Sequence, residues 1–362
     1  MLKVFEAFAG IGSQSMALRN IGCDYSVVGI LEVDKNALIA YDSIHNNNEK
    51  VEVVSKDEML SEFADKNIGY NFSTGKSEIP RKEEDIRKLY EAHIRSRNYG
   101  DIRKLDVSVL PEFDLFTYSY PCKNVSVAGQ QAGLDINSGT QSALLWECER
   151  VIQAKKPKYL LMENVKNLVG ATHMPNFKKW QDILSEMGYS NHWAVLNASN
   201  YGLPQNRERV IMVSILGENE FKFNLGVPTT VCIEDILSER IDLGCNMLRL
   251  KEDITSPVSA LYQVGMTDKK GNDSNRRIYS TYGYSPTLNS MNGGNRQPKF
   301  IDKDGKLIKL SPLECWRIMG YTDEDYYKAK NAGLPKTRLY ERAGRGIAVP
   351  MLEEIFREML KY

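Results

Sequence analysis

Short apolar runs alternate with helical patterns through the first half of the chain, and this alternation restricts the fold more than any other feature. Residues 2–8, LKVFEAF, and 25–32, YSVVGILE, have the pattern of strands, and 13–22 between them has the pattern of a helix. Near-continuous apolar strands that alternate with helices are typical of a parallel sheet covered on both faces. The sequence therefore predicts an α/β fold. Further strands are expected at 113–119, 159–164 and 209–216, and further helices at 142–154 and 176–187.

Two regions interrupt this alternation. Residues 55–98 are highly charged, with apolar positions at helical spacing, so we expect a helical insertion on the surface, to which the sequence assigns no chemistry. From residue 217 to about 310, Gly, Pro, Asn and Ser become frequent, which predicts a second, smaller domain of irregular loops and short strands. The segment 346–362 has the pattern of an amphipathic helix and is expected to pack back on the α/β domain.

Length and composition exclude several classes of protein. With 362 residues, the chain has room for one large domain and one small domain. Its longest apolar runs are far too short to span a membrane, and its first residues lack a secretory pattern, so we expect a cytoplasmic protein. The 6 cysteines are scattered, with no CxxC pair and no histidine at metal-binding spacing, so neither a disulfide framework nor a metal site is expected.

The charge of the chain is balanced overall but unevenly distributed. It has 47 basic and 47 acidic side chains, which argues weakly against a nucleic-acid partner. The segment 269–309, however, holds nine basic and three acidic residues, a local balance of 9 − 3 = +6. Such a stripe can be the footprint of a phosphate backbone or a solvated loop rich in lysine, and charge alone leaves both interpretations open.

A glycine-rich turn lies between the first expected strand and the first expected helix. In FEAFAGIGSQ, Phe8 to Gly12 form a turn at which a ligand could approach the main chain and the helix N-terminus. An acid about twenty residues further on, here Glu32, suits a ribose diol, and Asp101 is placed to end a third strand. The pattern indicates a nucleoside cofactor. A tight turn without a ligand is the alternative, because Ser15 replaces the third glycine of the dinucleotide motif.

One cysteine stands at the expected carboxyl end of a strand. In FDLFTYSYPC, Cys122 follows an apolar run and a proline, at the sheet edge that faces the ligand crevice in open α/β folds. Backbone amides around it could lower its pKa and make it a nucleophile. A small buried hydrophobic residue is the alternative for any single cysteine.

Two further motifs place polar side chains at strand ends. Glu163 follows the apolar run YLLM, where a protonated carboxyl could donate to a ring nitrogen, or where a loop acid could form a salt bridge. Gln205, Arg207 and Arg209 alternate along the start of the next strand, so we expect them on one face. An amide and two guanidinium groups suit contacts to phosphates or bases, and a polar edge strand is the alternative.

Taken in this order, the motifs resemble the DNA cytosine-5 methyltransferase family. The resemblance is carried by five features: the glycine-rich turn, the two acids, PC followed by S and AG, ENV, and QNRER. It covers nearly the whole chain apart from 55–98 and part of 217–275. It implies an α/β, Rossmann-like, S-adenosylmethionine-dependent methyltransferase domain over 1–216 and 325–362. The segment 217–324 is then a smaller, irregular target-recognition domain with a hinge.

The implied reaction is methyl transfer from S-adenosylmethionine to carbon 5 of a cytosine flipped out of a specific double-stranded DNA sequence, through a covalent adduct with Cys122. The product of the cofactor is then S-adenosylhomocysteine, and no metal is expected. The implied partners are double-stranded DNA and, in a restriction–modification system, a restriction endonuclease acting on the same site; the protein is expected to be a monomer. A tRNA-directed enzyme of the same family and a non-catalytic DNA-binding relative are the alternatives.

The resemblance also assigns roles to single residues. The catalytic residues are Cys122, Glu163 and Arg207. The cofactor-binding residues are Phe8, Ala9, Gly10, Gly12, Glu32, Val33, Asp101, Ile102, Pro121, Ala348 and Val349. The DNA-binding residues are Ser126, Gln205, Arg209, Thr287, Leu288 and Arg296.

Within this set, Glu32 is assigned to the ribose hydroxyls and Asp101 to the adenine amine. Three positions depart from the family pattern: Lys123, Val33 and Ile347 stand where a Gln, an aromatic residue and an Asn are common. The second and third departures are expected to weaken cofactor binding.

Overall fold

The protein divides into two compact units, each assembled from separate stretches of the chain. The structure, a computed structural model, describes residues 1–47, 49–52, 54–72, 74–121, 144–217, 220–291 and 296–361. Unit 1 comprises Met1–Val195, Arg209–Phe223 and Ile355–Tyr362, and unit 2 comprises Leu196–Glu208 and Asn224–Glu354. Within the described ranges, no helix combines the length and the apolar character needed to cross a membrane.

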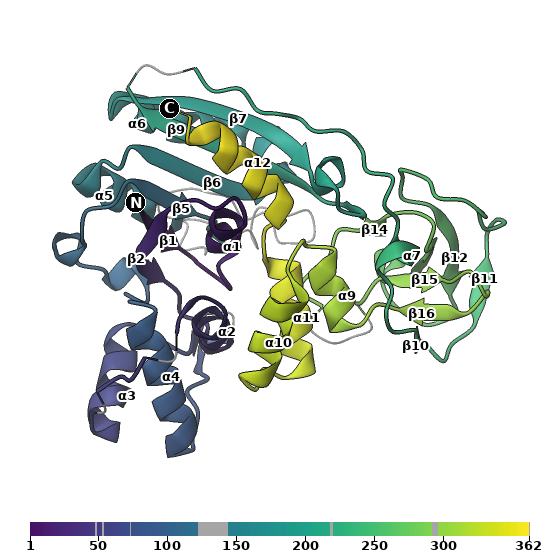
Figure 1. The fold of residues 1–362 in the computed structure, drawn as a ribbon, viewed down its shortest axis with the longest axis horizontal. Helices are drawn as coiled ribbons and strands as arrows, with labels where there is room; N and C mark the ends of the chain where they lie inside the picture. The colour runs from purple at the N-terminus through teal and green to yellow at the C-terminus, as the bar shows by residue number, and fades with distance from the viewer. Residues whose placement is uncertain are drawn as a thin grey trace. The chain divides into compact units, whose positions relative to one another are not determined.

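Unit 1 is built on a six-stranded sheet with the strand order β2-β1-β5-β6-β9-β7 (Figure 1). The strands are β1 (Leu2–Ala7), β2 (Tyr25–Leu31), β5 (Leu115–Tyr118), β6 (Tyr159–Val165), β7 (Tyr189–Asn197) and β9 (Glu208–Leu216). β1 runs parallel to β2 and to β5, and β5 runs parallel to β6. The predicted α/β fold is confirmed, and the five apolar runs expected to form strands each lie on a strand of this sheet.

The sheet is mixed rather than wholly parallel, because β9 runs antiparallel to β6. The chain reverses its direction between β7 and its neighbour β9, because the connection 198–207 is too short for the helical crossover that a parallel pair would require. Strand β7 was not expected from the sequence. Its residues are mostly half-buried and include polar side chains, so its pattern lacks the continuous apolar run that marks the other strands.

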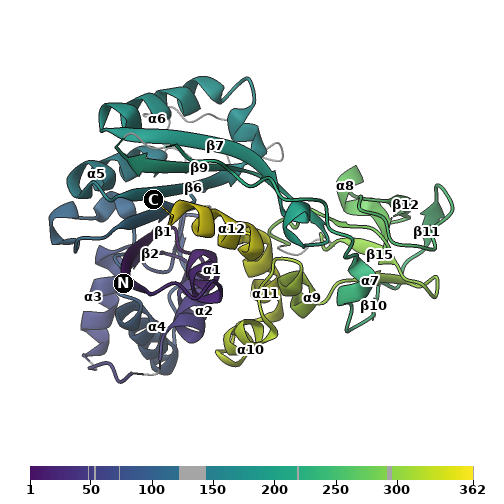
Figure 2. The same ribbon diagram turned by 45° about the horizontal axis from the view of Figure 1, so that its top comes forward.

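Helices cover both faces of this sheet. The helices α5 (Leu145–Lys155) and α6 (Met174–Glu186) bury Trp146 and Trp180 against Phe116 and Tyr118 of β5, in one hydrophobic cluster. The helices α1 (Ser13–Asn20) and α2 (Lys35–His45) belong to the other side, where Ser15 and Tyr41 meet the buried Glu6 of β1. Figure 2 shows α6 and α1 on opposite sides of the strands.

The charged insertion forms two helices and a small hairpin. They are α3 (Lys56–Asp65), β3 (Tyr70–Asn71), β4 (Lys76–Ser77) and α4 (Glu83–Arg95). The chain returns to the sheet through a single parallel bridge between Ile30 and Asn98. The expectation that Asp101 ends a third strand is wrong, because Gly100 turns the chain at a φ of 75° and Asp101 then begins a 3-10 helix, Ile102–Lys104.

Unit 2 contains a sheet of short strands with the order β10-β16-β15-β13-β12-β11. These strands are β10 (Ile241–Asp242), β11 (Met247–Arg249), β12 (Gln263–Thr267), β13 (Arg277–Ser280), β15 (Lys299–Ile301) and β16 (Leu307–Lys309). A separate pair, β8 (Gln205–Asn206) with β14 (Ser285–Pro286), runs parallel. The core of the larger sheet is small and centres on Val264, Ile278 and Ile301, which fits the frequent turn residues of this region.

The helices of unit 2 lie mainly toward its C-terminal end. They are α7 (Ile233–Ile236), α8 (Asp273–Arg276), α9 (Pro312–Arg317), α10 (Asp323–Asn331) and α11 (Lys336–Arg345). The expected C-terminal helix is present as α12 (Val349–Met359), whose residues up to Glu354 belong to unit 2 and whose remainder belongs to unit 1.

Candidate active site

The glycine-rich turn joins β1 to α1 through three residues with positive φ. Phe8, Gly10 and Gly12 have φ values of 56°, 59° and 76°. A side-chain carbon on Gly12 would lie 2.3 Å from Nε2 of His45 and 2.7 Å from Cε2 of Tyr41, so this position accepts only glycine without a rearrangement. A side-chain carbon on Gly10 would meet nothing nearer than a carbonyl oxygen at 4.0 Å, so the turn is open on that side.

The turn and the first predicted acid lie together at the ends of β1 and β2. The Glu32 carboxylate accepts hydrogen bonds from the main-chain N–H groups of Gly10 at 2.9 Å, Val33 at 2.8 Å and Asp34 at 2.7 Å. The main chain of Glu32 is in turn held by Asn98, which accepts from its N–H at 3.0 Å and donates to its carbonyl at 2.9 Å. The sequence therefore placed the Gly-rich turn, Glu32 and Val33 correctly beside one another.

The second predicted acid, Asp101, is buried and held by two side chains. Asn67 donates to its Oδ2 at 2.8 Å, and Arg103 donates to Oδ2 at 2.6 Å and to Oδ1 at 3.0 Å. Burial alone would raise the pKa of Asp101, but the hydrogen bonds from Arg103 and Asn67 outweigh it and hold that pKa below its ordinary value. The neighbouring Ile102 is also buried. Two carboxylates at the ends of adjacent chain segments suit the hydroxyls and amine of a nucleoside.

A buried acid that the sequence reasoning missed lies under the turn. Glu6 is fully buried and accepts hydrogen bonds from the hydroxyls of Ser15 and Tyr41, both at 2.8 Å. Burial raises its pKa to about 7. The signal was present in the sequence, since a glutamate inside the apolar strand LKVFEAF has to point toward a polar partner.

The carboxyl ends of β5 and β6 bring the remaining unit 1 candidates together. Glu163 pairs with Arg209, with 3.0 Å between Oε1 and Nε. The buried Asn164 donates to the carbonyl of Tyr120 at 3.2 Å. The sequence reasoning gave Asn164 no role, although it follows Glu163 directly. Arg209, which was expected to contact DNA, forms an ion pair with Glu163 in this structure.

Two predicted residues lie outside the part of the chain that the structure describes. The described chain leads from Tyr120 to Pro121 and resumes at residue 144. The predicted nucleophile Cys122 and the predicted DNA contact Ser126 both fall in the intervening segment, 122–143. Their roles therefore stay predictions from the sequence.

In unit 2, the predicted catalytic Arg207 binds main-chain carbonyls. Its side chain is buried and donates to the carbonyl oxygens of Leu288 at 3.1 Å, Gly344 at 3.2 Å and Gly346 at 2.7 Å. Arg207 lies between β8 and β9 rather than within one continuous strand. The regular alternation from which a shared face with Arg209 was expected is therefore interrupted at Arg207.

The predicted Gln205 is fully buried and also holds Leu288. Its side-chain oxygen accepts from the Leu288 N–H at 3.1 Å, and its amide nitrogen donates to the carbonyl of Ile318 at 2.9 Å. Thr287 donates to the carbonyl of Asn206 at 2.7 Å. The structure thus brings four predicted residues of unit 2 together: Gln205, Arg207, Thr287 and Leu288.

The other predicted residues of unit 2 lie apart from this group in the sequence. Ala348 and Val349 are fully buried at the start of α12, and the Val349 N–H donates to the carbonyl of Met319 at 2.9 Å. Arg296 is exposed beside residues 292–295, which are not described. Within the basic stripe, Lys299 is buried, donates to two main-chain carbonyls, and has its pKa lowered by burial to about 8.

Among the residues that the structure describes, no group of three or more His, Cys, Asp or Glu side chains is arranged to hold a metal ion. The chemistry available at the described sites is that of carboxylates, guanidinium groups, amides and main-chain N–H groups.

Comparison with protein families gives one match over most of the chain. Residues 73–361 match the model for the C-5 cytosine-specific DNA methylase. Among curated proteins, the chain is similar to the type II methyltransferase M2.ScrFI of Lactococcus lactis subsp. cremoris, at 39% identity over 100% of this chain and 99% of that protein. It is 33% identical to the orphan methyltransferase M.SssI of Spiroplasma monobiae, over 98% of this chain and 96% of the relative.

Solved structures show the same fold at low sequence identity. The S. pombe Dnmt2 methyltransferase has a TM-score of 0.61 at 15% identity, covering 100% of this chain and 99% of that one. A putative DNA modification methyltransferase encoded within a prophage of E. coli has a TM-score of 0.59 at 15% identity, covering 100% of this chain and 99% of that one.

Proposed function

Since this chain belongs to the family of C-5 cytosine-specific DNA methylases and is therefore a DNA methyltransferase, we propose that it methylates carbon 5 of a flipped-out cytosine in a specific double-stranded DNA sequence. S-adenosylmethionine is the methyl donor and Cys122 the covalent catalyst. The observation that carries this proposal is the hydrogen bond from Asn164 to the Tyr120 carbonyl. It joins the residue after Glu163 to the segment that leads into Cys122.

The residues around the glycine-rich turn fit S-adenosylmethionine. The turn is open at Gly10, and the Glu32 carboxylate is fixed beside this opening by three main-chain N–H groups. Glu32 would bind the ribose hydroxyls, Asp101 the adenine amine, and Val33 and Ile102 the faces of the base. The bound cofactor supplies a methyl group on a sulfonium, which is the electrophile. The proposed set is completed by Phe8, Ala9, Gly12, Pro121, Ala348 and Val349.

Cys122 is proposed to add as a thiolate to carbon 6 of the cytosine, forming a carbon–sulfur bond. The addition makes carbon 5 resemble that of an enamine, which is nucleophilic enough to be methylated. A base then removes the proton from carbon 5, the carbon–sulfur bond breaks, and the aromatic ring and the free thiolate are restored. This chemistry is impossible inside a stacked duplex, so the base has to leave the helix.

Glu163 is proposed to hydrogen-bond at cytosine N3 and to stabilise the charge that develops there. Two contacts support this role. The ion pair with Arg209 holds the carboxyl at the end of β6, and the two side chains are each only 12% exposed. The next residue, Asn164, is tied to the Tyr120 carbonyl. A carboxyl group that is held by an ion pair, and that lies next to an anchored residue, is oriented before the substrate arrives.

In unit 2, we assign Arg207 and Gln205 to positioning rather than to direct contact with DNA. Both are buried, and both use their polar atoms on the main chain of Leu288. Thr287 and Leu288 would then lie beside the flipped base, and Arg296 would contact the DNA backbone together with Ser126. The exposed part of the basic stripe would follow the phosphates.

The cellular setting is proposed on the same basis. We expect a monomer in the bacterial cytoplasm, acting either beside a restriction endonuclease of the same specificity or as an orphan enzyme of a phage or host. Relatives of both kinds match the chain, a type II enzyme at 39% identity and an orphan enzyme of Bacillus phage SPbeta at 28% identity.

The test begins with expression of the protein in bacteria that have no cytosine methylation of their own. Bisulfite sequencing of their DNA then identifies the methylated sequence. A duplex carrying 5-fluorocytosine at that position should then trap the enzyme in a complex that survives denaturing electrophoresis and requires S-adenosylmethionine. Fluorine cannot leave as a cation, so the adduct persists. Tritiated methyl transfer to tRNA, assayed in parallel, distinguishes the RNA-directed alternative.

Cys122→Ala should abolish trapping while DNA binding remains, and Glu163→Gln should slow trapping strongly. Mass spectrometry should map the adduct to Cys122. Mapping to Cys148 or Cys315, which are both buried, would contradict the assignment of the nucleophile. Absence of any methylated cytosine in the cellular DNA would contradict the proposed function as a whole.

A further inference from the structure

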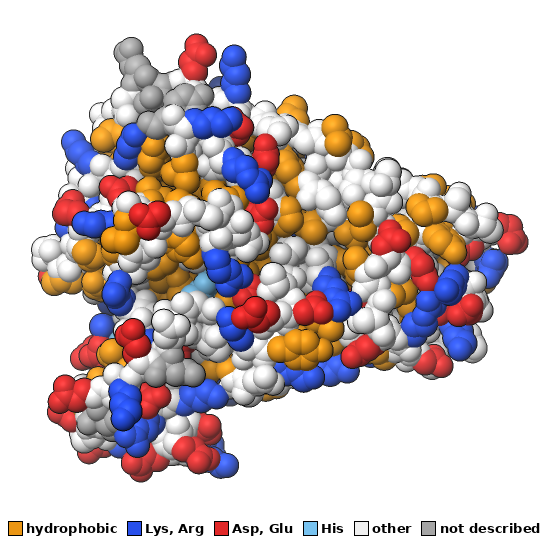
Figure 3. Space-filling model, viewed as in Figure 1, with side chains coloured by type: hydrophobic (Ala, Val, Ile, Leu, Met, Phe, Trp, Pro, Cys, Tyr) orange, Lys and Arg blue, Asp and Glu red, His pale blue; other side chains and the backbone are white. Residues whose placement is uncertain are grey.

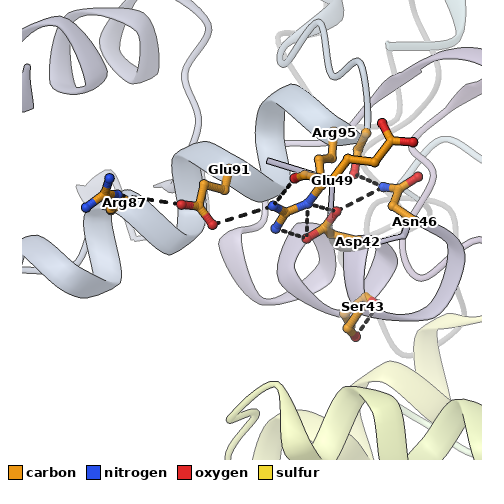
Figure 4. Close-up of polar contacts among 9 residues, drawn as sticks. Asp42, Ser43, Asn46, Glu49, Arg87, Glu91 and Arg95 are labelled. Carbon is orange, nitrogen blue, oxygen red and sulfur yellow. Dashed lines mark hydrogen bonds and ion pairs between the residues drawn. The ribbon is translucent and has the colours of Figure 1, made fainter. Parts of the chain in front are cut away.

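The charged insertion is fixed to α2 by a cluster of ion pairs and hydrogen bonds. Arg95 of α4 donates to both carboxylate oxygens of Asp42 in α2, at 2.7 Å through Nη2 and at 3.0 Å through Nε (Figure 4). Asn46 donates to Asp42 at 3.0 Å and to Ser96 at 3.0 Å. The Arg95 and Asp42 side chains are only 13% and 11% exposed, so solvent screens this pair weakly.

Apolar packing joins the insertion to the same part of unit 1. Met59 and Phe63 of α3 and Ile86 and Leu89 of α4 are buried in one cluster with Leu38 and Tyr41 of α2. The outward faces of α3 and α4 carry mixed charges, visible at the lower left of Figure 3. The insertion therefore shares its core with the helix that follows the first cofactor-site acid.

The turn after α3 reaches both sides of the predicted nucleoside site. The N–H of Gly69 donates to the carbonyl of Val33 at 2.7 Å, and the N–H of Asp101 donates to the carbonyl of Lys66 at 3.0 Å. A side-chain carbon on Gly100 would lie 2.4 Å from that Lys66 carbonyl, so the two segments pack backbone to backbone. This approach leaves little freedom for the main chain around Asp101.

Two side chains of the same turn complete the surroundings of Asp101. Asn67, at a φ of 54°, donates from Nδ2 to Oδ2 of Asp101 at 2.8 Å. The guanidinium of Arg103, which binds the same carboxylate, lies 4.2 Å from the ring centroid of Phe72. Positive φ is unusual for a residue other than glycine, and asparagine tolerates it better than most. The turn thus presents its amide to Asp101 from a fixed backbone position.

We propose that the insertion is part of the cofactor site and that Asn67 is a positioning residue for Asp101. Its amide orients the Asp101 carboxylate toward the amine of the cofactor's adenine. The inference rests on the proposed function, because it takes the ligand of Asp101 to be an adenine nucleoside. It extends that function by assigning recognition of the base to a segment that the sequence marked only as a charged surface helix. Asn67 acts through Asp101 and does not itself contact the cofactor.

The experiment is a thermodynamic cycle on the full-length protein with two ligands. Isothermal calorimetry measures the affinity for S-adenosylhomocysteine and for S-inosylhomocysteine, in which a carbonyl oxygen replaces the adenine amine. The variant is Asn67→Gly, which keeps the positive φ available and removes only the side-chain amide. We expect 5- to 10-fold weaker binding of S-adenosylhomocysteine and less than 2-fold change for S-inosylhomocysteine, about the effect of one hydrogen bond of ordinary strength.

Asn71→Gly is the matched control. Asn71 lies in the same insertion, where its side-chain amide donates to a carboxylate, Oε1 of Glu78, at 2.6 Å, and its side-chain oxygen accepts from the Thr74 N–H at 3.2 Å. We expect this variant to bind both ligands as the wild-type protein does. In steady-state methylation, Asn67→Gly should raise the KM for S-adenosylmethionine by the same 5- to 10-fold and leave kcat within 2-fold.

Equal weakening of both ligands by Asn67→Gly would show that the residue supports the fold generally and would overturn the inference. Unchanged binding of S-adenosylhomocysteine, or the same loss in Asn71→Gly, would overturn it as well. If the wild-type protein binds neither ligand, the proposed function fails instead, so the two failures are distinguishable.

Discussion

The two units hold their candidate functional groups in opposite ways. In unit 1, main-chain N–H groups of Gly10, Val33 and Asp34 hold the side chain of Glu32. In unit 2, the side chains of Gln205 and Arg207 hold the main chain of Leu288. In unit 1 the backbone conformation positions a functional side chain, whereas in unit 2 the hydrogen bonds of two buried side chains position the main chain. Substitutions should therefore act by different physical routes in the two units.

The largest effect is expected for Arg207→Met. The change removes the donor of three carbonyls, the buried ones of Leu288 and Gly344 and the half-buried one of Gly346, and leaves them without these hydrogen bonds. We expect a loss of about 3–5 kcal/mol in the free energy of unfolding, measured by urea denaturation, together with loss of methyl transfer. Arg207→Lys should recover only part of this stability, since one ammonium cannot reproduce the planar fork. A loss below about 1 kcal/mol would show that side chains are not what holds unit 2.

The next effect concerns the buried acid under the turn of unit 1. Glu6 has its pKa raised by burial from 4.5 to about 7, so the folded state binds more protons than the unfolded state between these values. Protonated Glu6 therefore contributes about 3 kcal/mol to the free energy of unfolding at low pH, and this contribution is lost as the pH rises through 7. Glu6→Gln should match the wild type near pH 5 and be more stable by that amount near pH 8, in urea denaturation at both values. Equal pH profiles for the two proteins would contradict the raised pKa.

A smaller loss of stability is expected for Gly12→Ala, which tests directly whether the backbone conformation positions the functional group in unit 1. An alanine at a φ of 76° is strained, and its side-chain carbon would meet His45 at 2.3 Å. We expect a loss of about 2 kcal/mol in stability and a clear weakening of S-adenosylhomocysteine binding in calorimetry. Gly22→Ala is a suitable control, because its φ of 69° is similar but its surroundings are open. The two variants should differ in ligand affinity; if they do not, close packing at Gly12 is unimportant.

The smallest effect is expected for Gln205→Ala. The Leu288 N–H and the Ile318 carbonyl each lose one neutral hydrogen bond, without loss of a charge. We expect about 1–2 kcal/mol of destabilisation, less than for Arg207→Met, by the same urea measurement. A double variant should lose less than the sum of the two single losses, because both residues act on Leu288. Full additivity would indicate that the two contacts are independent.

The local periodicity of the sequence was sufficient to predict the α/β fold of unit 1. The strands β5, β6 and β9 are buried on both faces, so their apolar runs are visible without knowledge of their neighbours. The Gly-rich turn and Glu32 were predictable for a similar reason, since a strand–turn–helix unit brings nearby residues together. The position of α12 also followed from helical spacing, whereas the turn residues indicated that unit 2 has short strands but not where those strands lie.

The remaining contacts depend on tertiary structure and carry no local signal. Asn67 and Asp101 are 34 residues apart, and Gln205 and Leu288 are 83 residues apart. Nothing in the charged pattern of the insertion distinguishes Asn67 from its neighbours. Likewise, the QNRER motif gives no indication that Arg209 binds a carboxylate in unit 1 while Arg207 binds carbonyls in unit 2.

The interleaving of the two units along the chain has a consequence for protein synthesis. The chain passes from one unit to the other after residues 195, 208, 223 and 354. The buried residues Ile355, Phe356 and Met359 belong to unit 1, yet they leave the ribosome only after all of unit 2 has been made. At ordinary translation rates this delay is on the order of ten seconds. During that time, unit 1 lacks three of its buried apolar side chains, so its packing is completed only after unit 2 has been made.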